Sequence, residues 1–123
     1  NGKEITIVAY GAAVHWVLDT LKENTHIDAD VIDLRCLQPL DKETILTSVK
    51  KTGKALIVQE DSLFGGIASD ISALIHENCF EYLDAPVQRV ASLETPIPFV
   101  SQLEDQYLPK GRLENALKTL LAY

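Results

Sequence analysis

The segment that most constrains the fold is the apolar run Ala55-Leu56-Ile57-Val58 together with the residues that follow it. Four apolar residues without polar alternation predict a strand that is covered by helices on both faces. We predict this strand over Ala55–Gln59. The polar residues Gln59-Glu60-Asp61 and the glycines Gly65-Gly66 then predict a turn from the strand into a helix. Such a unit belongs at the centre of an open α/β sheet, where ligand crevices form.

Length and composition predict one globular domain over residues 1–123. A chain of 123 residues buries roughly two-thirds of its unfolded surface. The formal net charge of −7 argues against binding to nucleic acid or to anionic membranes, because both need a basic surface. It is compatible with a partner that has a basic surface. Because the chain begins at Asn1 without a methionine, we expect it to be a piece of a longer protein.

Two cysteines are too few and too far apart to predict a disulfide scaffold or a zinc site. A reducing, cytoplasmic setting is therefore expected. Cys36 follows Arg35, and a cationic neighbour can favour a reactive thiolate. We nevertheless expect Cys36 to be a buried, inert thiol.

Hydrophobic periodicity predicts alternating strands and helices along the rest of the chain. The four predicted strands are Ile5–Tyr10, Ala29–Leu34, Ala55–Gln59 and Pro86–Ala91. Gly11 is predicted to end the first strand in a tight turn, and the first helix then runs to about Glu23 with Val14, Val17, Leu18 and Leu21 on one side. The second helix is predicted over Lys42–Thr52. The third follows Gly66 with Ile67, Ile71, Leu74, Ile75 and Asn78 on one side, and the last follows Pro109 with Leu113, Ala116, Leu117, Leu120 and Leu121 on one stripe. Thr95–Phe99 cannot be regular structure, because its two prolines lack donors and fix φ.

The helix over Lys42–Thr52 has a signal at each end. Asp41 is expected to cap its first turn, and Leu40 with Ile45 stands at the positions of a hydrophobic staple. Lysines in the last turn and Gly53 after it are typical of a helix C-terminus.

This alternation predicts a three-layer α/β/α domain with a mainly parallel sheet and right-handed crossovers. The expected strand order is 2-1-3-4, which places Ala29–Leu34 at an edge. The order reverses between the first and third strands, so the loops at Gly11 and at Glu60–Gly66 should flank a crevice.

The candidate site residues are the polar groups and glycines at that crevice. His15 is either an acid–base group or, as we favour, a hydrogen-bonded structural histidine. Glu60 and Asp61 either bind a ligand or, as we favour, satisfy backbone donors of the following loop. Gly65 and Gly66 either hold an anion at a helix start or permit close helix–sheet packing. We expect His26 and His76 at the surface, and no phosphate-binding or nucleophile-elbow motif is present.

Taken together, the segments resemble the C-terminal domain of the β subunit of thiamine-diphosphate-dependent 2-oxo acid dehydrogenase E1 components, which has the transketolase C-terminal domain fold. The matching segments are Ile5–Gly11 with Val14-His15, Val31–Arg35 with Pro39-Leu40-Asp41, Ser48-Val49 with Lys51-Thr52-Gly53, Gln59-Glu60, Gly65–Ala68, Ala85-Pro86-Val87 with Arg89-Val90, Thr95-Pro96 with Pro98, and Leu108-Pro109. They cover essentially the whole chain.

The resemblance implies a parent enzyme that decarboxylates a 2-oxo acid on thiamine diphosphate and acylates the lipoyl group of an E2 acyltransferase. In that family the cofactor and its magnesium lie between two other domains, and the G-D-G…N metal motif is absent from this sequence. We therefore expect no catalytic residue, cofactor site or metal site within these 123 residues. The domain is expected to join other E1 domains or subunits.

Family members dock the peripheral subunit-binding domain of E2 through an acidic residue before the Ala-Pro-Val strand and through their C-terminal residue. The corresponding residues here are Asp84 and Tyr123. The loop Asp61–Ile67 resembles the branched-chain type more than the pyruvate type. The competing hypothesis is a stand-alone flavodoxin-like module that binds a small anion near Gly11 and Gly65.

Overall fold

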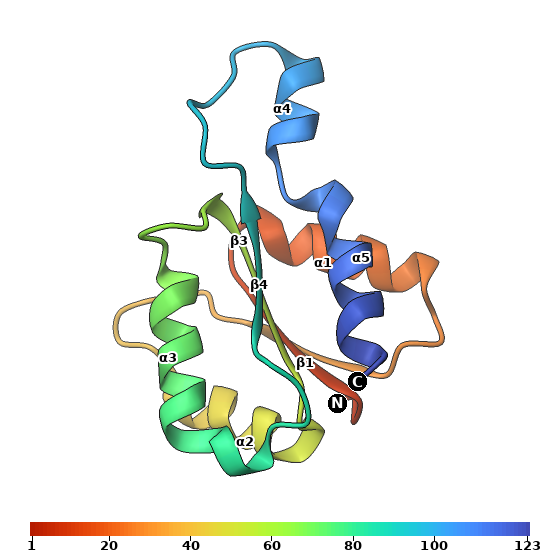
Figure 1. Cartoon of the computed structure of the whole chain (residues 1–123), viewed down its shortest axis with the longest axis vertical. Helices are drawn as coiled ribbons and strands as arrows, with labels where there is room; N and C mark the ends of the chain where they lie inside the picture. Colours follow the sequence, from red (N-terminus) through yellow and green to blue (C-terminus); the bar gives the residue numbers. More distant parts are fainter.

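A computed structural model describes residues 1–123, and its centre is a four-stranded sheet with the order β2-β1-β3-β4 (Figure 1). The strands are β1 (Ile5–Ala9), β2 (Ala29–Asp33), β3 (Ala55–Ser62) and β4 (Gln88–Ser92). All three neighbouring pairs are parallel. The predicted strand order and the edge position of β2 are therefore confirmed.

Helices cover both faces of the sheet. They are α1 (Ala12–Glu23), α2 (Lys42–Thr52), α3 (Ile67–Cys79), the 3₁₀ turn η1 (Phe80–Tyr82), α4 (Ser101–Tyr107) and α5 (Lys110–Leu121). α1 and α5 pack on one face, whereas α2 and α3 pack on the other (Figure 1). The three-layer α/β/α architecture follows from this arrangement. None of the helices combines the length and the apolar character of a membrane-spanning segment.

The strand β3 is buried from both sides, as its apolar run predicts. Leu56 and Val58 belong to the core under α1 and α5. Ala55 and Ile57 belong to the core under α2 and α3. All four side chains are fully buried, so two helix layers meet the alternating faces of one strand.

The end of β3 differs from the prediction. The strand continues to Ser62 through the polar residues that we assigned to the turn. Its pairing with β4 is irregular between Val58 and Ser62, and the Ser92 hydroxyl donates a hydrogen bond to the Glu60 carbonyl oxygen. Pairing with a distant strand thus extends β3 beyond its apolar run. The other predicted strand boundaries differ by one or two residues, the usual uncertainty at strand ends.

The ends of α2 form as predicted. The Thr44 backbone N–H donates to Asp41 Oδ1 at 3.1 Å, which satisfies one of the free donors of the first turn. At the other end Gly53 adopts a left-handed φ of 71°, and its N–H donates to the Val49 carbonyl oxygen at 2.9 Å. This positive φ suits a glycine at the end of a helix.

Two local predictions are wrong, and one helix was not predicted. Cys36 is exposed rather than buried. It lies in the irregular connection between β2 and α2, and its thiol donates to the Gln38 carbonyl oxygen at 3.3 Å. Asn78 is exposed and does not share the apolar side of α3; its amide donates to the Leu74 carbonyl oxygen. The helix that has no counterpart among the predicted elements is α4, which has seven residues and buries only Tyr107.

Candidate functional site

Because β1 and β3 pair in parallel, their C-terminal ends lie close together. Burial raises the pKa of the Tyr10 hydroxyl, and the negative charges of Asp61 and Glu60 raise it further. Both carboxylates are exposed. Asp61 Oδ1 accepts a hydrogen bond from the Ser62 backbone N–H at 2.7 Å, which agrees with our preferred interpretation that it satisfies a donor in the loop.

Gln59 is the residue at this edge that sequence reasoning did not single out. Its side chain is fully buried. Its Oε1 accepts from the Ala68 backbone N–H at 2.8 Å, and its Nε2 donates to the Ser62 carbonyl oxygen at 2.7 Å. The amide therefore fastens the start of α3 to the end of β3. A glutamine directly after an apolar strand is the only sequence signal for this role.

Gly66 provides the space for that amide. A Cβ atom placed on Gly66 would lie 2.1 Å from Gln59 Nε2. Close helix–sheet packing therefore explains Gly66 without an anion. Gly65 has a φ of +73° and open space around it, so backbone conformation is a sufficient reason for a glycine there.

The predicted crevice residues do not share a pocket. None of the five main pockets is lined by Gly11, His15, Gly65 or Gly66. Asp61 alone among the predicted residues lines one of them, together with Phe64, Ile97 and Tyr107. This arrangement offers no support for a small-anion module at the crevice.

The three histidines are all exposed. His15 makes no side-chain hydrogen bond within the chain, so our expectation of a hydrogen-bonded structural histidine is wrong. His26 lies in the turn after α1, and His76 contacts the Ser72 carbonyl oxygen through Nδ1 at 2.8 Å. The surface positions predicted for His26 and His76 are confirmed.

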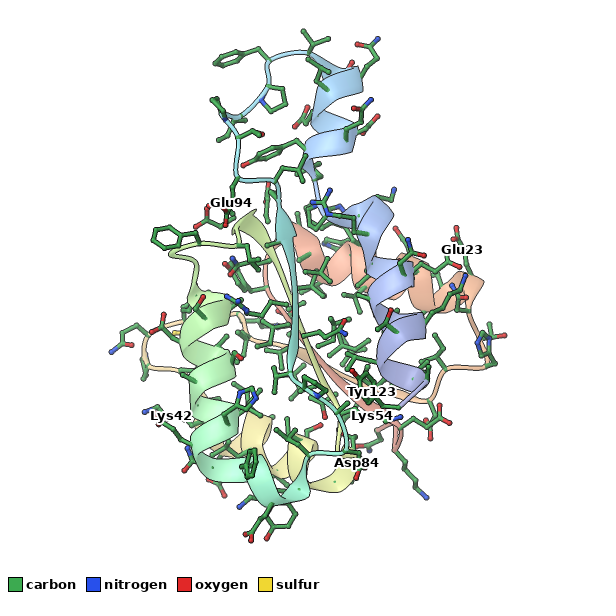
Figure 2. All side chains as sticks on the ribbon, viewed as in Figure 1. Glu23, Lys42, Lys54, Asp84, Glu94 and Tyr123 are labelled. Atoms are coloured by element: carbon green, nitrogen blue, oxygen red, sulfur yellow. The ribbon has the colours of Figure 1, made fainter.

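Asp84 and Tyr123 lie together at the other end of the molecule, beside the N-terminal ends of the strands, with Lys54 between them (Figure 2). Asp84 is exposed, and its backbone N–H donates to the Gly53 carbonyl oxygen at 2.8 Å. Tyr123 is also exposed. Lys54 Nζ lies 3.5 Å from the Leu121 carbonyl oxygen, so a cation separates the two predicted docking residues. Sequence reasoning did not identify this lysine.

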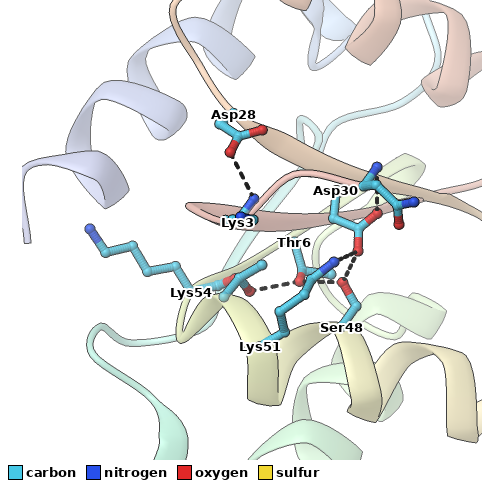
Figure 3. Close-up of polar contacts among 9 residues, drawn as sticks. Lys3, Thr6, Asp28, Asp30, Ser48, Lys51 and Lys54 are labelled. Carbon is cyan, nitrogen blue, oxygen red and sulfur yellow. Dashed lines mark hydrogen bonds and ion pairs between the residues drawn. The ribbon is translucent and has the colours of Figure 1, made fainter.

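A polar network ties α2 to the two strands beneath it (Figure 3). The buried Thr6 hydroxyl is 2.7 Å from Ser48 Oγ and 2.8 Å from Thr52 Oγ1. Ser48 donates to Asp30 Oδ2 at 2.8 Å, and Lys51 forms an ion pair with the same carboxylate. Each polar group in this network has a partner, so the network fastens α2 to the edge strand β2. No group of three or more His, Cys, Asp or Glu side chains is placed to hold a metal ion.

Comparison with known proteins shows similarity along nearly the whole chain. The family model for the transketolase C-terminal domain matches residues 1–112. The pyruvate dehydrogenase E1 component subunit beta of Bacillus subtilis is 45% identical over 98% of this chain and 38% of its own length. The mitochondrial 2-oxoisovalerate dehydrogenase subunit beta of Dictyostelium discoideum is 44% identical over 98% of this chain and 34% of its own length.

Two further relatives extend the comparison. The pyruvate dehydrogenase E1 component subunit beta of Rickettsia felis is 41% identical over 89% of this chain and 34% of its own length. A solved structure described as a split-gene transketolase, an inactive β4 tetramer, superposes with a TM-score of 0.79 at 26% identity and covers 99% of this chain and 40% of that one. The chain thus spans roughly a third of the length of the curated relatives that it matches.

Proposed function

Because the chain belongs to the transketolase C-terminal domain family, we propose that it is the C-terminal domain of the β subunit, or β-like half, of a 2-oxo acid dehydrogenase E1 component. The observation that supports this most is the similarity to E1 β subunits, at 44% and 45% identity over 98% of the chain. In this proposal the parent enzyme decarboxylates a 2-oxo acid on thiamine diphosphate and acylates the lipoyl group of E2. The domain itself assembles with other E1 subunits and docks E2.

The residues of this domain do not fit the cofactor. No cluster of side chains is placed to hold magnesium, and the sequence contains no phosphate-binding loop motif. We therefore derive no catalytic step within this domain. We propose that the remainder of the parent protein and its partner subunits bind thiamine diphosphate and magnesium.

For the docking of E2 we propose the exposed surface that contains Asp84 and Tyr123. Both residues lie beside the N-terminal ends of the strands, and an acidic group and an exposed aromatic ring on one surface suit a basic helical partner. Lys54 lies between them, so the attraction is local to Asp84 and does not extend over the whole surface. A cationic side chain of E2 would therefore approach Asp84 from the side away from Lys54.

Substitution of these two residues tests the docking surface. In the complete E1 enzyme, Asp84→Asn should weaken binding of the E2 subunit-binding domain by about 1–3 kcal/mol, the range for a hydrogen bond to a charged group. Tyr123→Ala should act in the same direction through lost apolar contact. Isothermal titration calorimetry measures both effects, and Glu23→Gln, an exposed acid at the end of α1 (Figure 2), is the control that should leave the affinity unchanged.

A second readout separates docking from catalysis. Decarboxylation of the free oxo acid, measured without E2, should be the same in all three variants, because no residue of this surface contacts the cofactor in our proposal. If the Asp84 and Tyr123 variants both bind E2 as tightly as the wild-type enzyme does, this surface is not part of the interface.

For the substrate we propose a branched-chain 2-oxo acid, with pyruvate as the next candidate. The support is the likeness of the loop Asp61–Ile67 to the branched-chain type. Relatives named for either substrate have similar identities to this chain. The ratio of kcat/KM for the two oxo acids, measured on the complete enzyme, distinguishes the candidates. We also propose a reducing, cytoplasmic setting, in keeping with two free cysteines.

A further inference from the structure

The carboxylate of Asp84 lies directly on Gly53, the glycine that ends α2. A Cβ atom placed on Gly53 would overlap Asp84 Oδ2 and would lie 3.0 Å from Asp84 Cγ. Carbon atoms in contact are normally about 3.5–4.0 Å apart, so both positions cannot be filled. Gly53 is itself buried. The carboxylate therefore occupies space that exists only because residue 53 has no side chain.

The backbone around Asp84 is held against the end of α2. The Asp84 N–H donates to the Gly53 carbonyl oxygen at 2.8 Å, and the Tyr82 carbonyl oxygen is 3.2 Å from the same Cβ position. Lys50 Nζ, in the last turn of α2, lies 5.3 Å from the centre of the Tyr82 ring, at a distance typical of a cation–π contact. Ala85 is buried in the core. A methyl group on residue 53 would therefore displace the exposed end of the Asp84 side chain, because the backbone on either side is fixed.

Backbone conformation alone does not account for Gly53. Its φ is 71°, and a positive φ favours glycine wherever it occurs. Gly65 has nearly the same φ of +73°, but a Cβ atom there would meet nothing within 4 Å. Only at Gly53 does the missing side chain also make room for a charged group. Gly53 is thus subject to a second constraint, and that constraint concerns the position of Asp84.

The position of the carboxylate on Gly53 also separates it from the nearest cation. Lys54 follows Gly53 directly in the sequence, yet neither Asp84 nor Lys54 forms an ion pair within the chain. Lys54 Nζ lies instead 3.5 Å from the Leu121 carbonyl oxygen, at the end of α5. Because opposite charges attract each other more strongly as they approach, a carboxylate held on Gly53 is kept from pairing with Lys54.

We propose that Gly53 is a positioning residue for the binding of E2: its lack of a side chain places the Asp84 carboxylate where a cationic group of E2 binds it. This inference rests on the proposed function, in which Asp84 docks E2, and adds a residue that acts through Asp84. The strength of a charge-assisted hydrogen bond depends on where the acceptor lies. Displacing the carboxylate therefore weakens binding although its charge is kept.

The test uses the complete E1 enzyme and the subunit-binding domain of E2. Gly53→Ala should weaken the affinity measured by isothermal titration calorimetry by about fivefold or more, the lower end of the effect expected for Asp84→Asn. Gly65→Ala is the matched control, because it also places alanine at a positive φ but meets no neighbouring atom. It should leave the affinity for E2 unchanged. Decarboxylation of the free oxo acid without E2 should be unchanged in Gly53→Ala.

A double-mutant cycle separates positioning from a general effect on the structure. In an enzyme that carries Asp84→Ala, no carboxylate lies on residue 53, so adding Gly53→Ala should cause no further loss of affinity. The strain of alanine at a positive φ is present with and without Asp84→Ala. A purely structural effect of Gly53→Ala would therefore weaken E2 binding equally in both backgrounds.

Three results would overturn the inference. If Gly53→Ala binds E2 as tightly as the wild-type enzyme while Asp84→Asn binds it weakly, Gly53 does not position the carboxylate, and the docking surface stands. If Gly53→Ala weakens binding by the same factor with and without Asp84→Ala, its effect does not pass through the carboxylate. If Asp84→Asn and Tyr123→Ala both leave the affinity unchanged, the proposed docking surface fails and the role of Gly53 fails with it.

Discussion

At the scale of single residues, the contact between Gln59 and Gly66 is the clearest constraint on sequence. The Gln59 side chain is fully buried and uses both its oxygen and its nitrogen in hydrogen bonds. It cannot move away from a new methyl group without breaking one of these bonds. The Ser62 carbonyl oxygen, 2.8 Å from the same Cβ position, closes the other side.

We therefore expect Gly66→Ala to destabilise the domain by about 1–3 kcal/mol, the cost of an overpacked site or of a lost buried hydrogen bond. Gly111→Ala is the matched control. Gly111 lies within α5, and a Cβ atom there meets nothing within 4 Å, so alanine should stabilise the helix by about 0.5–1 kcal/mol. Urea unfolding of both variants tests the pair. Equal stability of Gly66→Ala and wild type would mean that the amide is free to move.

At the scale of elements, α2 is joined to the edge strand β2 through Asp30. The hydrogen bond from Lys51 lowers the pKa of the Asp30 carboxyl below its ordinary value, and the hydrogen bond from Ser48 adds to the effect. A carboxyl whose pKa is lower in the folded state stabilises that state above its unfolded pKa of about 3.9. This contribution is lost as the pH falls through the lower, folded pKa.

The prediction is a difference in pH dependence. Between pH 6 and pH 3, the urea midpoint of the wild-type domain should fall more than that of Asp30→Asn, because only the wild type has the paired Asp30 carboxylate to protonate. Lys51→Gln should behave like Asp30→Asn, since it removes the main cause of the shift. Parallel pH profiles for wild type and Asp30→Asn would show that the Asp30 pair contributes nothing to stability.

At the scale of the whole molecule, two surfaces lie at opposite ends of the parallel strands. The end of the molecule beside the N-termini of the strands contains Asp84, Lys54 and both ends of the chain, whereas the segment between β4 and α5 projects beyond the other end (Figures 1 and 2). The core between them consists of packed apolar groups and of polar groups that have hydrogen-bond partners. In our proposal this domain therefore connects subunits, and the chemistry takes place elsewhere in the parent enzyme.

Calorimetry with thiamine diphosphate and magnesium tests that division. The 123-residue chain should show no binding, because its sequence has no diphosphate-binding motif and its side chains form no metal cluster. The complete parent enzyme, titrated under the same conditions, is the positive control. Micromolar binding by this chain alone would contradict the assignment of the chemistry to other parts of the enzyme.

The sequence by itself determined most of the element types and the strand order. The apolar run of β3 required cover on both faces. The alternation of strands and helices favours a parallel sheet with right-handed crossovers, because this is the usual way to connect such elements. The ends of α2 were also predictable, because Asp41 and Gly53 act within one turn of the helix. These features depend on local chemistry, so local patterns are enough to predict them.

Only the tertiary structure decided the remaining features, since each depends on residues that are distant in sequence. β3 extends to Ser62 because β4 pairs with it. Gln59 is buried because the start of α3 folds back onto it, which also gives Gly66 its role. The exposure of Cys36 depends on the path of the connection between β2 and α2. The position of Lys54 between Asp84 and Tyr123 depends on where the end of α5 lies. Long-range packing decides these contacts, and no short pattern in the chain encodes it.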